Sequence, residues 1–344
     1  METAEHATLD LLPIKSREVY ENSYTRFMTW RNNNKANSFS ENVIIAYLAD
    51  LATKIKPSTL WSHYSMLKAT LNVKHGVDIR KYPKLVPYLK NKSHGYQPKK
   101  SKTLTMEQVQ SFLTEAPDFK YLMTKVCLIF GVAGALRRDE LSQMKTSDIT
   151  DLEGALLVKV PNTKTKKPRS FTITGEQYLN FYRKYASLRP ADMNTNRFFI
   201  KYQNGKCHRQ VVGIHKLTST AQEVATYLGL PDLKLYTGHC LRRTSATLLM
   251  NAGADISALK RHGGWQSTSI AESYIAESVT HMMKTSDQIL NNDLPSQQDF
   301  NLEPQPSTSR AAESNVVSAL SNHPVQVNNC TNCTVNITFN LNTS

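Results

Sequence analysis

Apolar residues recur every three or four positions along most of residues 16–290, which is the spacing of amphipathic helices. Within the first hundred residues this spacing predicts helices over residues 16–31, from Ser40 to Leu51, from Pro57 to Gly76, and over residues 82–90. Ser40 is a favourable N-cap, while proline suits the start of a helix and glycine its end. We therefore predict that residues 1–92 form a small all-helical domain.

A second domain is predicted over residues 104–290. Only residues 155–160 and 169–174 alternate apolar and polar side chains, and they flank the polar stretch 161–168, which indicates a β-hairpin with a basic tip. The other apolar segments have helical spacing, at residues 105–115, 119–130, 178–185, 214–227, 239–251, 255–262, 268–276 and 279–290. The predicted fold class is mainly α: a helical domain followed by a mostly helical α+β domain with a small antiparallel sheet.

The charge is strongly positive and lies outside the C-terminal tail. The chain carries a formal net charge of +14, whereas residues 291–344 contain one arginine and four acids, which leaves +17 on residues 1–290. Such a surplus favours a nucleic-acid or anionic partner. Residues 93–103 form a basic segment with Lys99, Lys100 and Lys102, which we interpret as a linker between domains. A solvated loop, a nuclear-import signal and a strand crossing a phosphate backbone all fit its composition.

Residues 291–344 are rich in Gln, Asn, Ser, Thr and Pro, so we expect a disordered tail. Its end alternates over residues 333–341, which is the period of a strand that would have to pair with another chain or sheet edge. Cys330 and Cys333 form one CxxC pair with only His323 nearby, which is too few ligands for a structural zinc site. We predict no metal site.

The first fifteen residues lack the apolar core of a secretory signal. The longest apolar run, Val126 to Leu136, has 11 residues, which is too short to cross a bilayer. We expect no membrane association and an intracellular location, in the nucleus if the chain is eukaryotic and otherwise in the cytoplasm.

Two segments near the end of the second domain carry chemistry. His239 and Arg242 are three residues apart on a predicted helix, so both side chains can address one anion. Trp265 follows a glycine pair and precedes Tyr274 by nine residues. In this order the segments resemble the tyrosine recombinase (phage integrase) family, in which a His-x-x-Arg helix precedes a His or Trp and then a nucleophilic tyrosine. The glycine pair resembles the Cre branch.

The remaining family positions can be sought upstream. The segment from Arg137 to Leu141 resembles the family's Arg-x-x-Glu-Leu element, which assigns Arg137 as catalytic rather than Arg138, because Arg138 would point about 100° further around a helix. Glu140 is expected to orient a basic side chain. Lys164 lies on the hairpin tip, where the family carries a catalytic lysine, with Lys166 and Lys167 as alternatives.

These residue types suit phosphodiester exchange. Tyr274 would be the nucleophile, forming a phosphotyrosine that the resemblance places at a DNA 3′ phosphate. Arg137 and Arg242 have guanidinium forks that match two phosphate oxygens. His239 can move protons, and the indole N–H of Trp265 can hold one oxygen. Lys164 would protonate the 5′ leaving oxygen. Neither metal nor ATP is needed, because the covalent intermediate conserves the bond energy, so we predict no cofactor.

The resemblance implies double-stranded DNA as partner and self-association as dimers or tetramers on paired sites. The N-terminal helices would clamp the DNA, and we expect phosphate contacts from Lys99, Lys100, Lys102, Lys166, Lys167 and Arg243. Residues 279–290 would dock on a neighbouring protomer through Val279, Met282, Met283, Ile289 and Leu290.

Three functions compete. The first is an active recombinase, of a kind that resembles the Crypton-type enzymes of eukaryotic transposons. The second is a domesticated DNA-binding protein that keeps the fold without strand transfer, although such proteins usually lose the nucleophile or an arginine and neither is lost here. The third is a type IB topoisomerase, which generally carries His at the position of Trp265.

Overall fold

The computed structural model describes residues 11–275 and 279–290. None of the helices in these two ranges is long and apolar enough to cross a membrane. The predicted strand over residues 333–341 and the Cys330/Cys333 pair lie outside the described residues.

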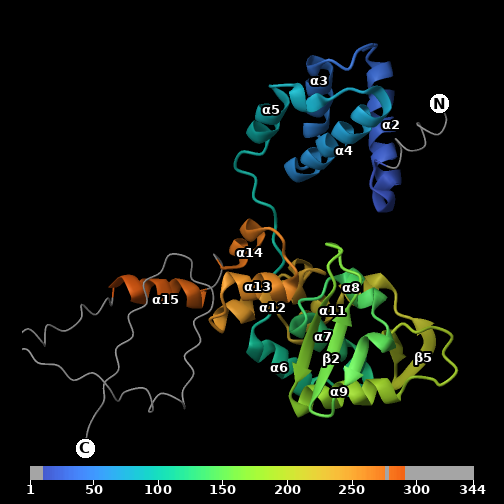
Figure 1. The fold of residues 1–344 in the computed structure, drawn as a ribbon, viewed down its shortest axis with the longest axis vertical. Helices are drawn as coiled ribbons and strands as arrows, with labels where there is room; N and C mark the ends of the chain where they lie inside the picture. The colour runs from blue at the N-terminus through green and yellow to red at the C-terminus, as the bar shows by residue number, and fades with distance from the viewer. Residues whose placement is uncertain (1–10, 276–278, 291–344) are drawn as a thin grey trace, which may run out of the picture. The chain divides into compact units, whose positions relative to one another are not determined.

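Four α-helices make up the N-terminal part: α2 (Arg17–Asn33), α3 (Glu41–Ala52), α4 (Pro57–His75) and α5 (Leu85–Lys92), with short 3-10 turns η1 (Ile14–Ser16) and η2 (Ile79–Lys81). Helices α2 and α3 pack against α4, and both α3 and α4 contact α5 (Figure 1). Helix α4 has Pro57 in its first turn and ends at Gly76, whose φ of 63° is left-handed. The predicted helices of this region are confirmed.

The core of this part is continuous and apolar. Phe27 of α2, Ile44 of α3, Leu67 of α4 and Leu89 of α5 are fully buried against one another. They come from the apolar faces that the sequence spacing indicated, and burying such side chains is the main force that holds short helices together.

The second part is mostly helical. It contains α6 (Met106–Glu115), α7 (Asp118–Ala133), α8 (Arg138–Gln143), α9 (Glu176–Ser187), α10 (Ile214–Thr218), α11 (Thr220–Tyr227), α12 (Cys240–Asn251), α13 (Ile256–Gly263), α14 (Thr268–Ile275) and α15 (Val279–Leu290), with 3-10 turns η3 (Thr146–Asp148) and η4 (Leu233–Leu235). The predicted single helix over 214–227 was wrong in one respect: it is divided at Ser219, which ends α10 and precedes α11.

Two small antiparallel sheets accompany these helices. The first has the order β1-β2-β3, built from β1 (Ile149–Asp151), β2 (Ala155–Val160) and β3 (Arg169–Thr174). Its hairpin pairs Val160 with Arg169, so the predicted hairpin is confirmed. The second sheet, β4 (Ile200–Gln203) with β5 (Lys206–Val211), was not predicted. The fold class, mainly α with a small antiparallel sheet, is confirmed.

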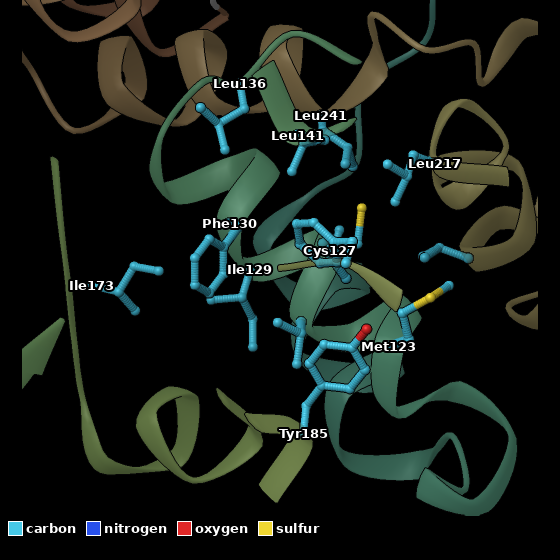
Figure 2. Close-up of a cluster of buried hydrophobic side chains, with 14 of the residues drawn as sticks. Met123, Cys127, Ile129, Phe130, Leu136, Leu141, Ile173, Tyr185, Leu217 and Leu241 are labelled. Atoms are coloured by element: carbon cyan, nitrogen blue, oxygen red, sulfur yellow. The ribbon is translucent and has the colours of Figure 1, made fainter. Parts of the chain in front are cut away.

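Helix α7 lies at the centre of the larger core. Every residue from Leu122 to Gly131 is buried, and α7 contacts α9, α11, α12 and β3. Figure 2 shows Cys127 and Phe130 of this helix among side chains from those neighbours, including Ile173, Tyr185 and Leu241. A helix that is buried on all sides shows no polar face.

Glycine allows α7 to approach α12 closely. A Cβ at Gly131 would lie 2.5 Å from the Leu241 Cδ1 atom, which no ordinary packing tolerates. This close contact lies beside the predicted site, because Leu241 directly precedes Arg242. The contact therefore fixes the depth at which Arg242 sits.

Candidate active site

Arg137 follows a tight turn at the end of α7. The chain turns through Ala135, whose φ of 45° is left-handed, and Arg137 then caps α8. The Glu140 carboxylate accepts the backbone N–H of Arg137 at 3.0 Å and its Nη1 at 2.7 Å. The Glu140 side chain is only 2% exposed, whereas that of Arg137 is 20% exposed. A buried carboxylate thus anchors a guanidinium that still reaches solvent.

Glu140 remains charged in this environment. Its burial alone would raise the carboxyl pKa, but the hydrogen bond from Arg137 and the positive charges of Arg169 and Arg137 outweigh burial and lower it. The expected role of Glu140, orienting a basic side chain, matches these contacts.

Arg242 lies on α12, within the core of the site, and is buried. Its guanidinium donates to the carbonyl oxygen of Ala135 and, at 2.7 Å, to that of Gly263. It also lies 4.0 Å from the ring centroid of Trp265, which is a cation–π contact. Burial and then the nearby charge of Arg137 lower the pKa of Arg242 to about 9, which leaves it cationic at neutral pH.

His239 precedes the first turn of α12 and is exposed. Desolvation lowers its pKa, and the positive charges of Arg242, Arg138, Arg137 and Lys164 act in the same direction. The imidazole is therefore neutral at pH 7 and able to accept a proton. The charges of these four side chains therefore act on His239.

Lys164 is exposed on the turn between β2 and β3. The turn is closed by its threonines, since Thr163 donates its hydroxyl to the Lys167 carbonyl at 2.7 Å and accepts the Lys166 backbone N–H at 3.0 Å. Lys166 adopts a left-handed φ of 56°. Lys164, Lys166 and Lys167 thus share one short exposed turn, and of the three it is the charge of Lys164 that acts on His239.

Trp265 and Tyr274 pack against each other. Their ring centroids are 5.2 Å apart, and Trp265 is buried whereas Tyr274 is partly exposed. The guanidinium of Arg243 lies 5.6 Å from the Tyr274 ring centroid. Gly263 makes room for the tryptophan, because a Cβ there would lie 1.7 Å from the Trp265 ring. This explains the glycine before the tryptophan that the sequence displayed.

Two partly buried polar residues of the site were not predicted. Arg169 of β3 donates to the Glu140 carboxylate and to backbone carbonyls on both sides of the site. His262 of α13 shares a 2.8 Å hydrogen bond with the Ser245 hydroxyl. Burial first, and then the charges of Arg169 and Arg242, lower the pKa of His262 to about 4. The sequence gives one weak signal for them, namely that Arg169 opens a strand and His262 adjoins the glycine pair.

The residues predicted to contact DNA fall into three places. Lys166 and Lys167 are exposed on the β2–β3 turn, and Lys99 and Lys100 are exposed before α6. Lys102 instead forms a 2.9 Å ion pair with Asp232, and its backbone N–H donates to Leu235.

Arg243 is partly buried beside the Tyr274 ring rather than on a separate surface. Among the described residues there is no cluster of three or more His, Cys, Asp or Glu side chains that could hold a metal ion.

Several solved structures share this fold. A XerH site-specific recombinase bound to its palindromic difH substrate, in a post-cleavage complex, aligns with a TM-score of 0.62 and 17% identity over 80% of each chain. Tn1549 transposon integrase in complex with circular intermediate DNA aligns with a TM-score of 0.55 and 18% identity, over 82% of this chain and 99% of that one. A lambda integrase dimer bound to a core site gives 0.51 and 14%, over 76% and 89% of the two chains. At this identity the alignments show a shared fold.

A search of curated proteins finds no match to the sequence. The model of the phage integrase family matches residues 102–281, which is more than half of the chain and includes every side chain placed in the site above. The resemblance found in the sequence is confirmed, and the chain belongs to the phage integrase family, the tyrosine recombinases.

Proposed function

We propose that the protein cuts and rejoins DNA strands through a 3′-phosphotyrosine intermediate, in site-specific recombination or transposon integration. One observation supports the proposal: contacts and charge interactions link six side chains that were predicted from four separate segments. Arg242 contacts the ring of Trp265, and Trp265 contacts Tyr274. Arg137 and Lys164 act electrostatically on His239, as Arg242 does.

The first half-reaction follows from these positions. The Tyr274 Oη atom attacks phosphorus, the bond from phosphorus to the DNA 5′ oxygen breaks, and the 3′ phosphate becomes esterified to the tyrosine. Arg137 and Arg242 stabilise the negative charge on the non-bridging oxygens. Because Arg242 is fixed by two carbonyls and one ring before DNA arrives, little reorganisation is needed at the moment of reaction. The indole N–H of Trp265 would hold one phosphate oxygen.

Proton transfers complete the cycle. His239 accepts the proton that the Tyr274 hydroxyl loses as it attacks phosphorus, which the lowered pKa of the imidazole allows at neutral pH. Lys164 donates a proton to the departing 5′ oxygen. In the second half-reaction a 5′ hydroxyl of another strand attacks the phosphotyrosine, the tyrosine leaves, and the phosphodiester is restored.

DNA is the proposed partner. The XerH, Tn1549 and lambda proteins of the same fold were solved on DNA, and this chain carries a net charge of +17 on residues 1–290. We propose that the N-terminal helices form the clamp domain over residues 1–92 and that residues 104–290 form the catalytic domain. A Crypton-type origin and a nuclear location remain part of this proposal.

The test is a covalent adduct. A duplex is first enriched from a random pool by binding to the Tyr274→Phe protein, and then nicked beside the bound site so that the cleaved end diffuses away. Wild-type protein should give an adduct that survives denaturation. Tyr274→Phe removes only a hydroxyl, so it should bind the duplex with unchanged affinity and form no adduct.

Tyr236 provides the control. Tyr236 is 5% exposed as a whole residue, and burial raises the pKa of its hydroxyl, so it is poorly placed to act as a nucleophile. An adduct that persists in Tyr274→Phe and disappears in Tyr236→Phe would move the nucleophile there. A wild-type protein that binds the duplex without any adduct would favour the domesticated DNA-binding function instead.

A further inference from the structure

We propose that Arg169 is a positioning residue for strand cleavage, which fixes the catalytic Arg137 through the Glu140 carboxylate. The inference rests on the proposed function. Arg169 takes no part in the phosphodiester chemistry described above. Its side chain is 8% exposed and pairs with Glu140, the residue that holds Arg137.

One guanidinium joins three segments of the site. Nη2 of Arg169 donates to Glu140 Oε2 at 2.8 Å. Nη1 donates to the Gly134 carbonyl at 2.6 Å and to the His262 carbonyl at 3.1 Å. Gly134 lies three residues before Arg137, and His262 lies three residues before Trp265. The strand that carries Arg169 is thereby tied to the turns that lead into two predicted catalytic residues.

Glu140 is shared between two arginines. Its Oε1 atom accepts from Arg137, while Oε2 accepts from Arg169 and from the Arg137 backbone. Since both Arg169 and Glu140 are less than a tenth exposed, the pair is screened little by solvent. Without Arg169, the Glu140 carboxylate would still accept the hydrogen bonds of Arg137, but it would lose the side-chain partner that fixes the orientation of the carboxylate plane.

A lysine cannot replace this arrangement. The planar fork of arginine reaches the carboxylate with one nitrogen and the two carbonyls with the other, whereas an ammonium is a single point. Arg169→Lys therefore keeps the charge that balances Glu140 but removes the bridge. A misplacement of Arg137 by about 1 Å is expected to slow cleavage about 100-fold.

Arg169 also lies five residues after Lys164, the proposed general acid. An effect of Arg169→Lys on Lys164 must therefore be distinguished from an effect on Arg137. The Lys164 turn is closed by its own threonine hydrogen bonds, which do not involve Arg169. We therefore expect the defect of Arg169→Lys to concern the charge on the phosphate and not the protonation of the leaving oxygen.

Three nicked substrates of the same sequence distinguish a loss of charge stabilisation at the phosphate from a loss of proton donation to the leaving oxygen. The first has the natural phosphate, the second a methylphosphonate, which lacks the negative charge that Arg137 stabilises, and the third a 5′-sulfur leaving group, which needs little protonation. Single-turnover adduct formation is measured with saturating protein. The deficit of Arg169→Lys relative to wild type should shrink at least about tenfold on the methylphosphonate and stay unchanged on the 5′-sulfur substrate.

Arg189→Lys is the matched control, because Arg189 also donates to two backbone carbonyls, those of Arg197 and Thr195, away from the site. It should lose a similar amount of thermal stability and cleave all three substrates at the wild-type rate. An equal deficit of Arg169→Lys on all three substrates would show a merely structural role and overturn the inference. A wild-type rate on the natural phosphate would overturn it as well.

If Arg169→Lys does not fold, Glu140→Gln breaks the same ion pair from the other end and should give the same substrate pattern; equal deficits would again reject the inference. A double variant should be no slower than the more impaired single variant, since both act on one contact. Absence of any wild-type adduct would overturn the proposed function and this inference with it, whereas a reactive wild type with an unimpaired Arg169→Lys rejects the inference alone.

Discussion

At the scale of single residues, the site mixes groups that hold structure with groups that we propose to react. Arg242 does both, because the two carbonyls that accept its hydrogen bonds belong to the turns before Arg137 and Trp265. A variant at Arg242 therefore removes buried hydrogen bonds together with the proposed phosphate contact. Tyr274→Phe is the cleaner probe of chemistry, because the Tyr274 ring packs on Trp265 and the change leaves that ring in place.

His262 predicts a pH dependence of stability. Its folded pKa of about 4 lies below the ordinary 6.5, so the unfolded chain binds the proton more readily than the folded one. The contribution is fully present above pH 6.5, is lost as the pH falls toward 4, and levels off below that. The loss should reach about 3 kcal/mol across this window.

The measurement is urea unfolding at several pH values, followed by tryptophan fluorescence. His262→Gln keeps an amide that can bond the Ser245 hydroxyl but does not titrate. The difference in free energy of unfolding between wild type and variant should therefore be independent of pH above 6.5 and should change as the pH falls below 6.5, because only the wild type loses stability there. Parallel curves for the two proteins between pH 4 and 6.5 would contradict the prediction.

The nature of these residues explains which could be predicted. Short motifs with characteristic spacings contain the residues that were predicted, and such motifs can be recognised in a sequence. These residues are Arg137, His239, Arg242, Trp265 and Tyr274. The Arg169 side chain bonds two backbone carbonyls and the His262 side chain bonds the Ser245 hydroxyl, and such contacts between distant segments leave no local pattern. The sequence therefore indicated the residues proposed to react and missed Arg169 and His262, which contact other parts of the site.

At the scale of elements, the helices followed from their apolar spacing and the second sheet did not. In β5 the residues from Lys206 to Val211 are mostly exposed and polar, so no alternation marks a strand. β1 has three residues, of which only Ile149 is buried. Both strands owe their structure to pairing with an adjacent strand, β5 with β4 and β1 with β2, because strand formation depends on such pairing and packing more than on the residues of the strand itself.

The β2–β3 turn carries the prediction that belongs to this scale. Lys164→Ala should slow adduct formation by about 10²–10⁴-fold, as expected for loss of a general acid. Lys166→Ala and Lys167→Ala serve as matched controls on the same exposed turn and should change the rate much less. A 5′-sulfur leaving group should restore the rate of Lys164→Ala, because a thiolate departs without a proton.

Rescue of Lys166→Ala or Lys167→Ala in place of Lys164→Ala would assign the general acid to that lysine. No rescue of any of the three by sulfur would remove the turn from proton transfer altogether. DNA affinity, measured in the same buffers, should fall by a similar small amount in all three variants, because each loses one positive charge near the phosphate backbone.

At the scale of the whole molecule, α15 is unusual among the described helices for its exposed apolar side chains. Met282, Met283, Ile289 and Leu290 are 51%, 62%, 67% and 77% exposed. Val279, the fifth apolar position expected to dock, belongs to the same helix. Single exposed apolar residues are ordinary, but several on one short helix favour burial against a partner. We propose that the partner is a second protomer on paired DNA sites.

Two shortened chains test this proposal on a duplex with two sites. A chain that ends at Leu290 keeps α15 and loses only residues 291–344, whereas a chain that ends at Ala276 loses α15 as well. Both should bind a single site nearly as the full chain does, since the Leu290 chain loses only Arg310 among the lysines and arginines and the Ala276 chain loses only Lys284 in addition. In sedimentation velocity the Leu290 chain should assemble on paired sites and the Ala276 chain should remain at one protomer per site. Unchanged assembly of the Ala276 chain would show that α15 is not the contact, and loss of assembly in the Leu290 chain would assign the contact to residues 291–344 instead.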